Sequence, residues 1–252
     1  MSATIPGAGP ATNQAGREAG ATTQRRTTPT LQVIRALLRK ELLVELRTLE
    51  SVPGMSLFAV TTFVVFHFAL NRNSIDGDLA AGVLWVTLLF AAMLGLNRLF
   101  VADADQGGFD GFLLAPVERS AMLVAKLLAL LTYLVVLEIV AVPAFLLLLA
   151  PSSDHAVGSL IGVLALGDIG VAAIGTLVAA LAVRTRARDL LGPLLALPLL
   201  VPIVIGGARA SSPLLVLGRA GSPPARWLLT LGLYDLVFGL IAYALFDFLL
   251  ED

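Results

Sequence analysis

Six apolar segments, each long enough to cross a lipid bilayer, constrain this chain more than any other feature of its sequence. A transmembrane helix needs about 20 mostly apolar residues. The chain is 58% hydrophobic and 14% charged, whereas soluble domains have about 25% charged residues. We therefore expect an all-α membrane protein with six transmembrane helices, at about residues 52–71, 79–101, 127–149, 157–183, 189–208 and 227–250. The third helix could also start inside the preceding loop, after Ser120. Pro193, Pro198 and Pro202 with Gly206-Gly207 predict that the fifth helix is kinked or broken.

Two segments of different character precede the first span. Residues 1–30 are rich in Ala, Thr, Gly and Pro and have too few large apolar side chains to fold, so we expect a disordered tail. In residues 31–51 leucine and isoleucine recur on one helical stripe, and charged residues occupy most of the remainder. Such a helix suits a solvated surface or the membrane interface, and the adjacent span favours the interface. Residues 52–252 then form the six-span domain.

The basic residues predict the orientation of the chain in the membrane. Cytosolic segments carry an excess of Lys and Arg. If the N-terminus is cytosolic, 13 of the 17 Lys and Arg residues lie in or near cytosolic segments and 4 lie on the other side. We therefore expect both termini, the loop at residues 102–120 and the basic turn at 184–188 to be cytosolic.

The loop at residues 102–120 has apolar residues where a polar loop is expected. It reads ADADQGGFDGFLLAPVERS, and its first part, to Gly108, is polar and is expected to be flexible. Asp110 can cap a short helix, which Pro116 would end. A short surface helix that is apolar on one side suits docking into a groove of a partner, or packing on its own bundle. The residues concerned are Asp110, Gly111, Phe112, Leu113, Leu114, Ala115 and Pro116.

Three carboxylates lie near the middle of predicted spans: Glu138, Asp168 and Asp235. A charged carboxylate at the bilayer centre costs about 2.5–3.5 kcal/mol on insertion scales. We therefore expect these acids to be protonated, hydrogen-bonded or directed into a cavity. They could form a polar pathway or a proton relay, or they could simply join helices by hydrogen bonds.

Other patterns exclude several classes of function. The chain has no cysteine and two histidines, and no histidine has a second ligand at a diagnostic spacing, so we expect no metal site. No phosphate-binding G-x-x-x-x-G-K-[ST] loop, catalytic triad or H-E-x-x-H motif occurs, so we expect no catalytic residues, and any ATP must bind another chain. The chain has no basic domain that would indicate nucleic-acid binding.

The glycines of the fourth span predict close packing of helices. They are Gly158, Gly162, Gly167, Gly170 and Gly175.

From about residue 37 to its end, the chain resembles the haem exporter protein B (CcmB) family, the permease subunit of the cytochrome c maturation ABC transporter. The similar stretches come in order along the chain and include the loop motif in its place. They are LLRKELLVELRTLES, VVFHFAL, AGVLWVTLLFAAMLGLNRLF, FDGFLLAPVERSAMLVAKLLA, GTLVAALAVRTRARDLLGPLLALPLLVPIVI and YDLVFGLIAYALFDFLLED.

The resemblance implies a non-catalytic ABC exporter permease in the bacterial cytoplasmic (inner) membrane. Residues 110–116 then look like the coupling helix that docks on the ATPase subunit. The implied partners are the ABC ATPase, a haem-handling membrane subunit, a small accessory subunit and a second copy of the chain, with the lipid bilayer as solvent. Haem would be transported or held by a partner, because two tryptophans, two histidines and no cysteine predict no tightly bound cofactor. The alternatives are an ABC permease for another substrate and a proton-coupled secondary transporter that uses the buried acids.

Overall fold

The computed structural model describes residues 30–49, 51–70, 74–105, 119–150, 156–182, 188–216 and 221–249. Within those ranges every regular element is a helix. The elements are α1 (Thr30–Thr48), α2 (Ser51–Ala69), α3 (Gly77–Asp105), α5 (Arg119–Leu148), α6 (Val157–Ala182), α7 (Arg188–Ser211), the 3-10 turn η1 (Ser212–Leu215) and α8 (Ala225–Leu249). The helices α2, α3, α5, α6, α7 and α8 are each long and apolar enough to cross a membrane, which confirms the predicted six-span all-α fold.

Two features of the helices differ from the sequence prediction. Helix α3 continues to Asp105, so the polar residues 102–105 are helical rather than part of a flexible loop. Helix α7 runs without a break from Arg188 to Ser211, so of the two predicted alternatives, a kink or a break at its prolines, the break was wrong. Hydrogen bonding and packing from neighbouring helices compensate for prolines inside a membrane bundle, and a local sequence pattern does not report them. Helix α5 begins at Arg119, close to the earlier of its two predicted starts.

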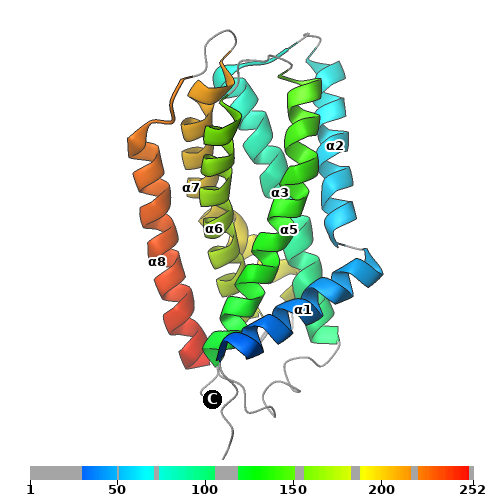
Figure 1. Ribbon diagram of the computed structural model, residues 1–252, viewed down its shortest axis with the longest axis vertical. Coiled ribbons are helices and arrows are strands. Elements are labelled where there is room, and N and C mark those ends of the chain that lie inside the picture. The colour runs from blue at the N-terminus through cyan, green and yellow to red at the C-terminus, as the bar shows by residue number, and fades with distance from the viewer. Residues whose placement is uncertain are drawn as a thin grey trace, which may run out of the picture.

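The six long helices form a bundle, and α1 lies obliquely across one end of it (Figure 1). Helix α8 ends at that same end, so both ends of the described chain lie together, as an even number of spans requires. Helix α6 packs against α5, α7 and α8. It is the most buried span, whereas α2 and α8 are peripheral: 72% of the spanning window of α6 is buried, against 17% for each of α2 and α8.

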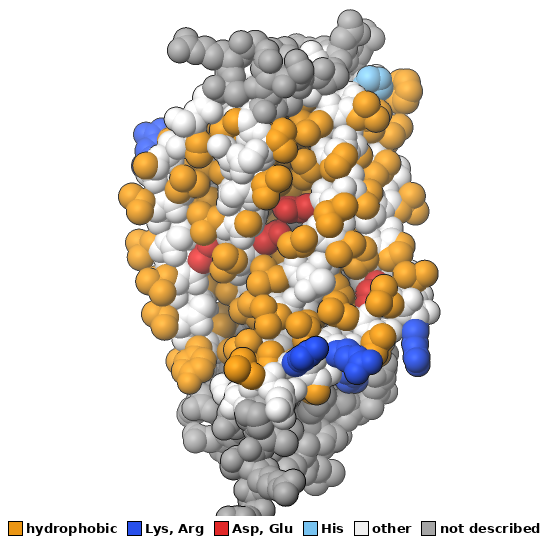
Figure 2. All heavy atoms as spheres, in the orientation of Figure 1, with side chains coloured by type: hydrophobic (Ala, Val, Ile, Leu, Met, Phe, Trp, Pro, Cys, Tyr) orange, Lys and Arg blue, Asp and Glu red, His pale blue; other side chains and the backbone are white. Residues whose placement is uncertain are grey.

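The outer surface of the bundle is apolar around its middle, and Lys and Arg side chains gather near the α1 end (Figure 2). The ends of the predicted leucine stripe are exposed, since Leu31, Leu46 and Leu49, just after α1, are 78%, 68% and 61% exposed. Ile34, Leu38 and Leu42 in its middle are half-buried, and Leu42 packs against the core. The buried residues of α1 are instead Glu41 and Glu45. The predicted amphipathic helix is present, and its inner side carries two acids as well as apolar groups.

Trp85 of α3 fixes the packing of three helices. Its side chain is buried, and its indole Nε1–H donates a 3.0 Å hydrogen bond to Ser211 Oγ at the end of α7. A Cβ added at Gly167 of α6 or at Gly207 of α7 would overlap the indole ring. These two glycines therefore make the space that the tryptophan occupies.

The predicted packing role of the α6 glycines is correct for three of them. Added Cβ atoms at Gly167, Gly170 and Gly175 would collide with side chains of neighbouring helices. Gly158 and Gly162 have no such atom within 4 Å, so for these two the packing role stays a prediction. The pattern of small residues did not reveal which ones face a neighbour.

Candidate functional site

A buried ion pair joins the surface helix α1 to α5. Lys126 Nζ donates a 3.0 Å hydrogen bond to Glu41 Oε1, and each side chain is only about a tenth exposed, at 10% and 11%. The hydroxyl of Tyr133 on α5 also donates to the backbone carbonyl of Glu41, at 3.3 Å. Two contacts between the same pair of helices therefore hold α1 against the start of α5.

Glu45, one helical turn beyond Glu41, joins α1 to the next helix. Its Oε1 accepts hydrogen bonds from the backbone N–H groups of Ser51 and Val52, at 2.9 and 2.8 Å. These N–H groups open α2 and have no partner within the helix, and the negative charge also favours a helix N-terminus. Leu49 turns the chain between the two helices with a left-handed φ of 49°. The turn between α1 and α2, which we call the α1–α2 elbow, is thus held by the Glu45 carboxylate.

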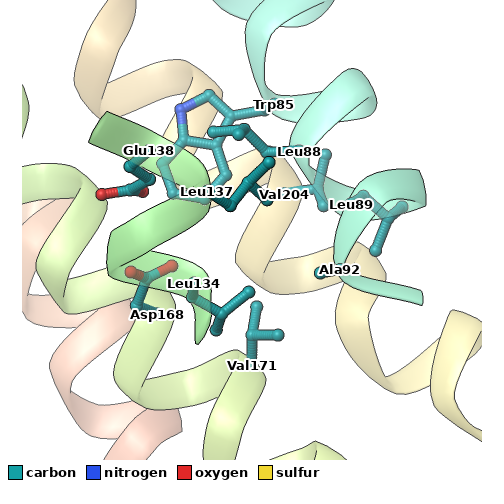
Figure 3. Close-up of a pocket in the computed structure, with 10 residues that line it drawn as sticks. All are labelled: Trp85, Leu88, Leu89, Ala92, Leu134, Leu137, Glu138, Asp168, Val171 and Val204. Carbon is teal, nitrogen blue, oxygen red and sulfur yellow. The ribbon is translucent and has the colours of Figure 1, made fainter. Parts of the chain in front are cut away.

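In the middle of the bundle, Glu138 of α5 and Asp168 of α6 line one small cavity. Figure 3 shows both carboxyl groups on the same side of the close-up, with the α3 residues across from them. The cavity has a volume of about 20 Å³. Its eight other lining residues are apolar or aromatic, and they are Trp85, Leu88, Leu89, Ala92, Leu134, Leu137, Val171 and Val204. We call this space the carboxyl cavity.

One oxygen of the Asp168 carboxyl group, Oδ2, has no hydrogen-bond partner inside the protein. The residue is 8% exposed, and its Oδ2 atom is buried without a partner. A buried polar atom left in this state costs roughly 1–3 kcal/mol. A cavity of about 20 Å³ is large enough for about one water molecule, which would need polar neighbours such as these carboxyl groups. The carboxyl cavity can therefore bind a small hydrogen-bonding species.

Asp235 of α8 lies apart from the lining of the carboxyl cavity. It is 7% exposed, and neither carboxyl oxygen has a hydrogen-bond partner. Its carboxyl group packs against Gly170 of α6, where a Cβ would collide with it, and beside Ile203 of α7. The structure thus brings two of the three predicted acids together and directs the third to a different contact. Figure 2 shows acidic side chains at mid-height within the apolar surface.

Several predicted site residues lie outside the described part of the chain. The coupling segment Asp110–Pro116 falls between Asp105, the last residue of α3, and Arg119, the first of α5. Among the described residues, no three or more His, Cys, Asp and Glu side chains are arranged to hold a metal ion. His67 of α2 is within 2.6 Å of the Leu148 carbonyl oxygen, to which its Nδ1–H can donate.

These features define the class of protein: a polytopic α-helical membrane protein of permease type, with a surface helix fixed to one end of a six-span bundle. Residues 32–246 match the family model described as CcmB protein. The chain therefore belongs to the CcmB family, as its resemblance predicted.

Curated relatives agree with this assignment. The chain is 31% identical over 215 residues to "Heme exporter protein B" of Bradyrhizobium diazoefficiens, covering 85% of this chain and 96% of the relative. It is 33% identical over 180 residues to the protein of that name from Rhodobacter capsulatus, covering 70% and 81%. The protein of that name from Pseudomonas aeruginosa is 28% identical over 179 residues, covering 71% and 80%.

Sequence reasoning missed the roles of Glu41, Glu45 and Trp85. Glu41 and Glu45 are four residues apart, so they share a helix face, and two acids on one face of an interfacial helix indicate partners nearby. Trp85 had no comparable signal, because its Gly167 and Gly207 neighbours become adjacent only in the folded bundle.

Proposed function

We propose that this chain is the membrane permease subunit of an ATP-driven haem exporter that acts in cytochrome c-type biogenesis. The observation that carries the proposal is the match to the CcmB family over residues 32–246, together with extensive similarity to proteins named "Heme exporter protein B". The chain lacks a phosphate-binding loop, so the proposal assigns ATP hydrolysis to a separate ABC ATPase subunit. The permease itself then has a mechanical role.

The proposed contact with the ATPase is the cytosolic coupling helix at residues 110–116. Phe112, Leu113 and Leu114 would insert apolar side chains into a groove of the ATPase. The loop that contains them continues directly into α5, and α5 is bound to α1 through Lys126 and Glu41. Displacement of the loop would therefore move α5 and α1 together, which supports a route from ATP hydrolysis to the bundle.

The complex that we propose lies in the bacterial inner membrane with both termini of this chain in the cytosol. Two copies of the permease would pair with two ATPase subunits. A haem-handling membrane subunit and a small accessory subunit would complete the assembly, and haem would be its cargo. The basic side chains near the α1 end of the bundle (Figure 2) favour that end as the cytosolic one.

The proposal is tested by affinity purification of the tagged chain from native membranes in mild detergent. Copurifying proteins are identified by mass spectrometry, haem is measured by absorbance, and the mass of the intact complex gives the copy numbers. Recovery of an ATPase with a haem-handling membrane subunit is the expected result. An ATPase alone would indicate another cargo. Absence of any ATPase would overturn the proposal and favour a proton-coupled secondary transporter.

A further inference from the structure

The carboxyl cavity holds two acids at a depth where the surrounding bilayer is apolar. Glu138 and Asp168 come from different helices, α5 and α6, yet they line the same space of about 20 Å³. Two ionised carboxylates that share such a small site repel one another, and the protein interior screens that repulsion poorly. Two neutral carboxyl groups, or one neutral and one charged, avoid this cost.

One hydrogen-bonding atom on the cavity lining is unused. Asp168 is more than nine-tenths buried and lines the cavity, and its Oδ2 has no partner within the protein. The one other polar group on the lining, the Trp85 Nε1–H, is already bonded to Ser211. The unused hydrogen-bonding capacity of this site therefore lies with the carboxyl groups (Figure 3).

The chemistry of the lining favours a proton over a metal cation. Calcium takes six to eight oxygen ligands and magnesium needs near-ideal octahedral coordination. Only Glu138 and Asp168 can supply oxygen from side chains that line this cavity. A proton needs just two acceptor atoms, and a single water molecule can bridge carboxyl groups that do not touch.

None of the other titratable side chains that the structure describes lines the cavity. Asp235 of α8 packs against Gly170, and Tyr234 donates to the Leu199 carbonyl.

The groups on the other elements lie at separate contacts or at the surface. Glu41 pairs with Lys126, and Tyr133 donates to the Glu41 carbonyl. Glu45 lies at the start of α2, and His67 lies near the Leu148 carbonyl. Asp78 pairs with Arg209 between α3 and α7. The remaining described groups are Arg35, Arg39, Lys40 and Arg47 on α1, Asp76 just before α3, and Arg226 and Tyr243 on α8.

We propose that Glu138 and Asp168 form an intramembrane proton-binding site, in which one proton is held between the two carboxyl groups with one water molecule in the carboxyl cavity. The proton comes from solvent water and no other bond is made or broken. When the proton leaves, both carboxylates are charged and α5 and α6 repel one another at this point. Proton binding therefore alters the packing of α5, the helix that follows the proposed coupling segment, whatever the cargo.

The site has a built-in reporter, because Trp85 lines the same cavity. The chain has two tryptophans, so Trp227→Phe leaves Trp85 as the only one. The W227F protein is reconstituted in lipid nanodiscs, and Trp85 emission is followed as pH is varied. The same titration is made on W227F/E138Q/D168N and, as a matched buried-acid control, on W227F/D235N.

We expect one titration step in W227F, its retention in W227F/D235N and its loss in W227F/E138Q/D168N. Each single variant, Glu138→Gln or Asp168→Asn, should shift or remove the step. A step that persists in the double replacement, or that disappears only with Asp235→Asn, would overturn the proposal. Size-exclusion profiles and thermal unfolding verify that each variant is folded.

Infrared spectroscopy gives a second measurement that does not require the two acids to be replaced. In the D235N protein, a protonated-carboxyl band that shifts on exchange into heavy water is expected at neutral pH. If that band is present without a fluorescence step, the proton is retained over the whole titration, which supports the site. If neither the band nor the step is found, Glu138 and Asp168 do not hold a proton, and the proposal fails.

Discussion

Lys126 of α5 and Glu41 of α1 form a 3.0 Å ion pair in which both side chains are about nine-tenths buried. The pair connects the one helix that crosses the end of the bundle to the helix that follows the loop at residues 102–120. Lys40, adjacent to Glu41 in sequence, lies 3.9 Å from the same carboxylate oxygen and is far more exposed, at 44%. Lys126 is therefore the closer and more buried of the two cations beside Glu41.

Replacing Lys126 with methionine should destabilise the protein, because the buried Glu41 would lose its close partner and keep only the more distant and more exposed Lys40. Breaking a buried pair by removing one partner typically costs about 3–5 kcal/mol, whereas removing both is much less costly. We expect K126M to lower the thermal unfolding midpoint and the double variant E41Q/K126M to recover part of the loss. A double-mutant cycle measured by thermal unfolding checks this, and strictly additive effects would exclude direct coupling of the pair.

Glu45→Ala should loosen the elbow between α1 and α2. The change removes both acceptor contacts to Ser51 and Val52 N–H, and loss of a helix cap costs about 0.5–2 kcal/mol. We expect faster amide hydrogen exchange at residues 51–52 with little change in α5. Arg47→Ala, at an exposed position of α1, is the control and should leave this exchange unchanged. Equal protection in E45A and the parent protein would contradict the capping role.

Gly167→Ala should destabilise the bundle, because the new methyl group would overlap the Trp85 ring. Overpacking of a core costs typically 1–3 kcal/mol. The matched control is Gly162→Ala on the same helix, where an added Cβ meets nothing within 4 Å and alanine has the better helix propensity. We expect a lower unfolding midpoint for G167A and an unchanged or higher one for G162A. Similar midpoints for the two would show that Trp85 does not fill this space tightly.

Phe112→Asp tests the proposed coupling helix. An aspartate at this position would put an unpaired charge into the apolar groove of the ATPase, so we expect at least a tenfold loss of copurifying ATPase. Phe112→Leu, which keeps an apolar side chain, should retain most of it. The measurement is the ratio of ATPase to permease after purification from membranes that contain equal amounts of both. Parental recovery of ATPase with F112D would refute the assignment of this segment.

The three acids within the spans show which features of the candidate site could be predicted from the sequence and which could not. Glu138, Asp168 and Asp235 could be identified because a carboxylate within an apolar span is costly wherever its partners lie. Their grouping could not be predicted, since it depends on how α5, α6 and α8 rotate and pack. Glu138 and Asp168 line the carboxyl cavity, whereas Asp235 lies against Gly170. For the same reason, periodicity located the helix of Glu41 and Glu45 without revealing that both side chains are buried.

Local sequence properties were enough to predict the six spans, the amphipathic pattern of α1 and the family, because the length and order of apolar runs do not depend on packing. The end of α3 at Asp105, the continuity of α7 through its prolines, and the partners of Lys126 and Trp85 depend on the folded bundle. Inside a bilayer most residues are apolar on every side of a helix. The hydrophobic pattern therefore places a helix in the membrane, and only close packing and a few polar contacts decide which face meets which neighbour.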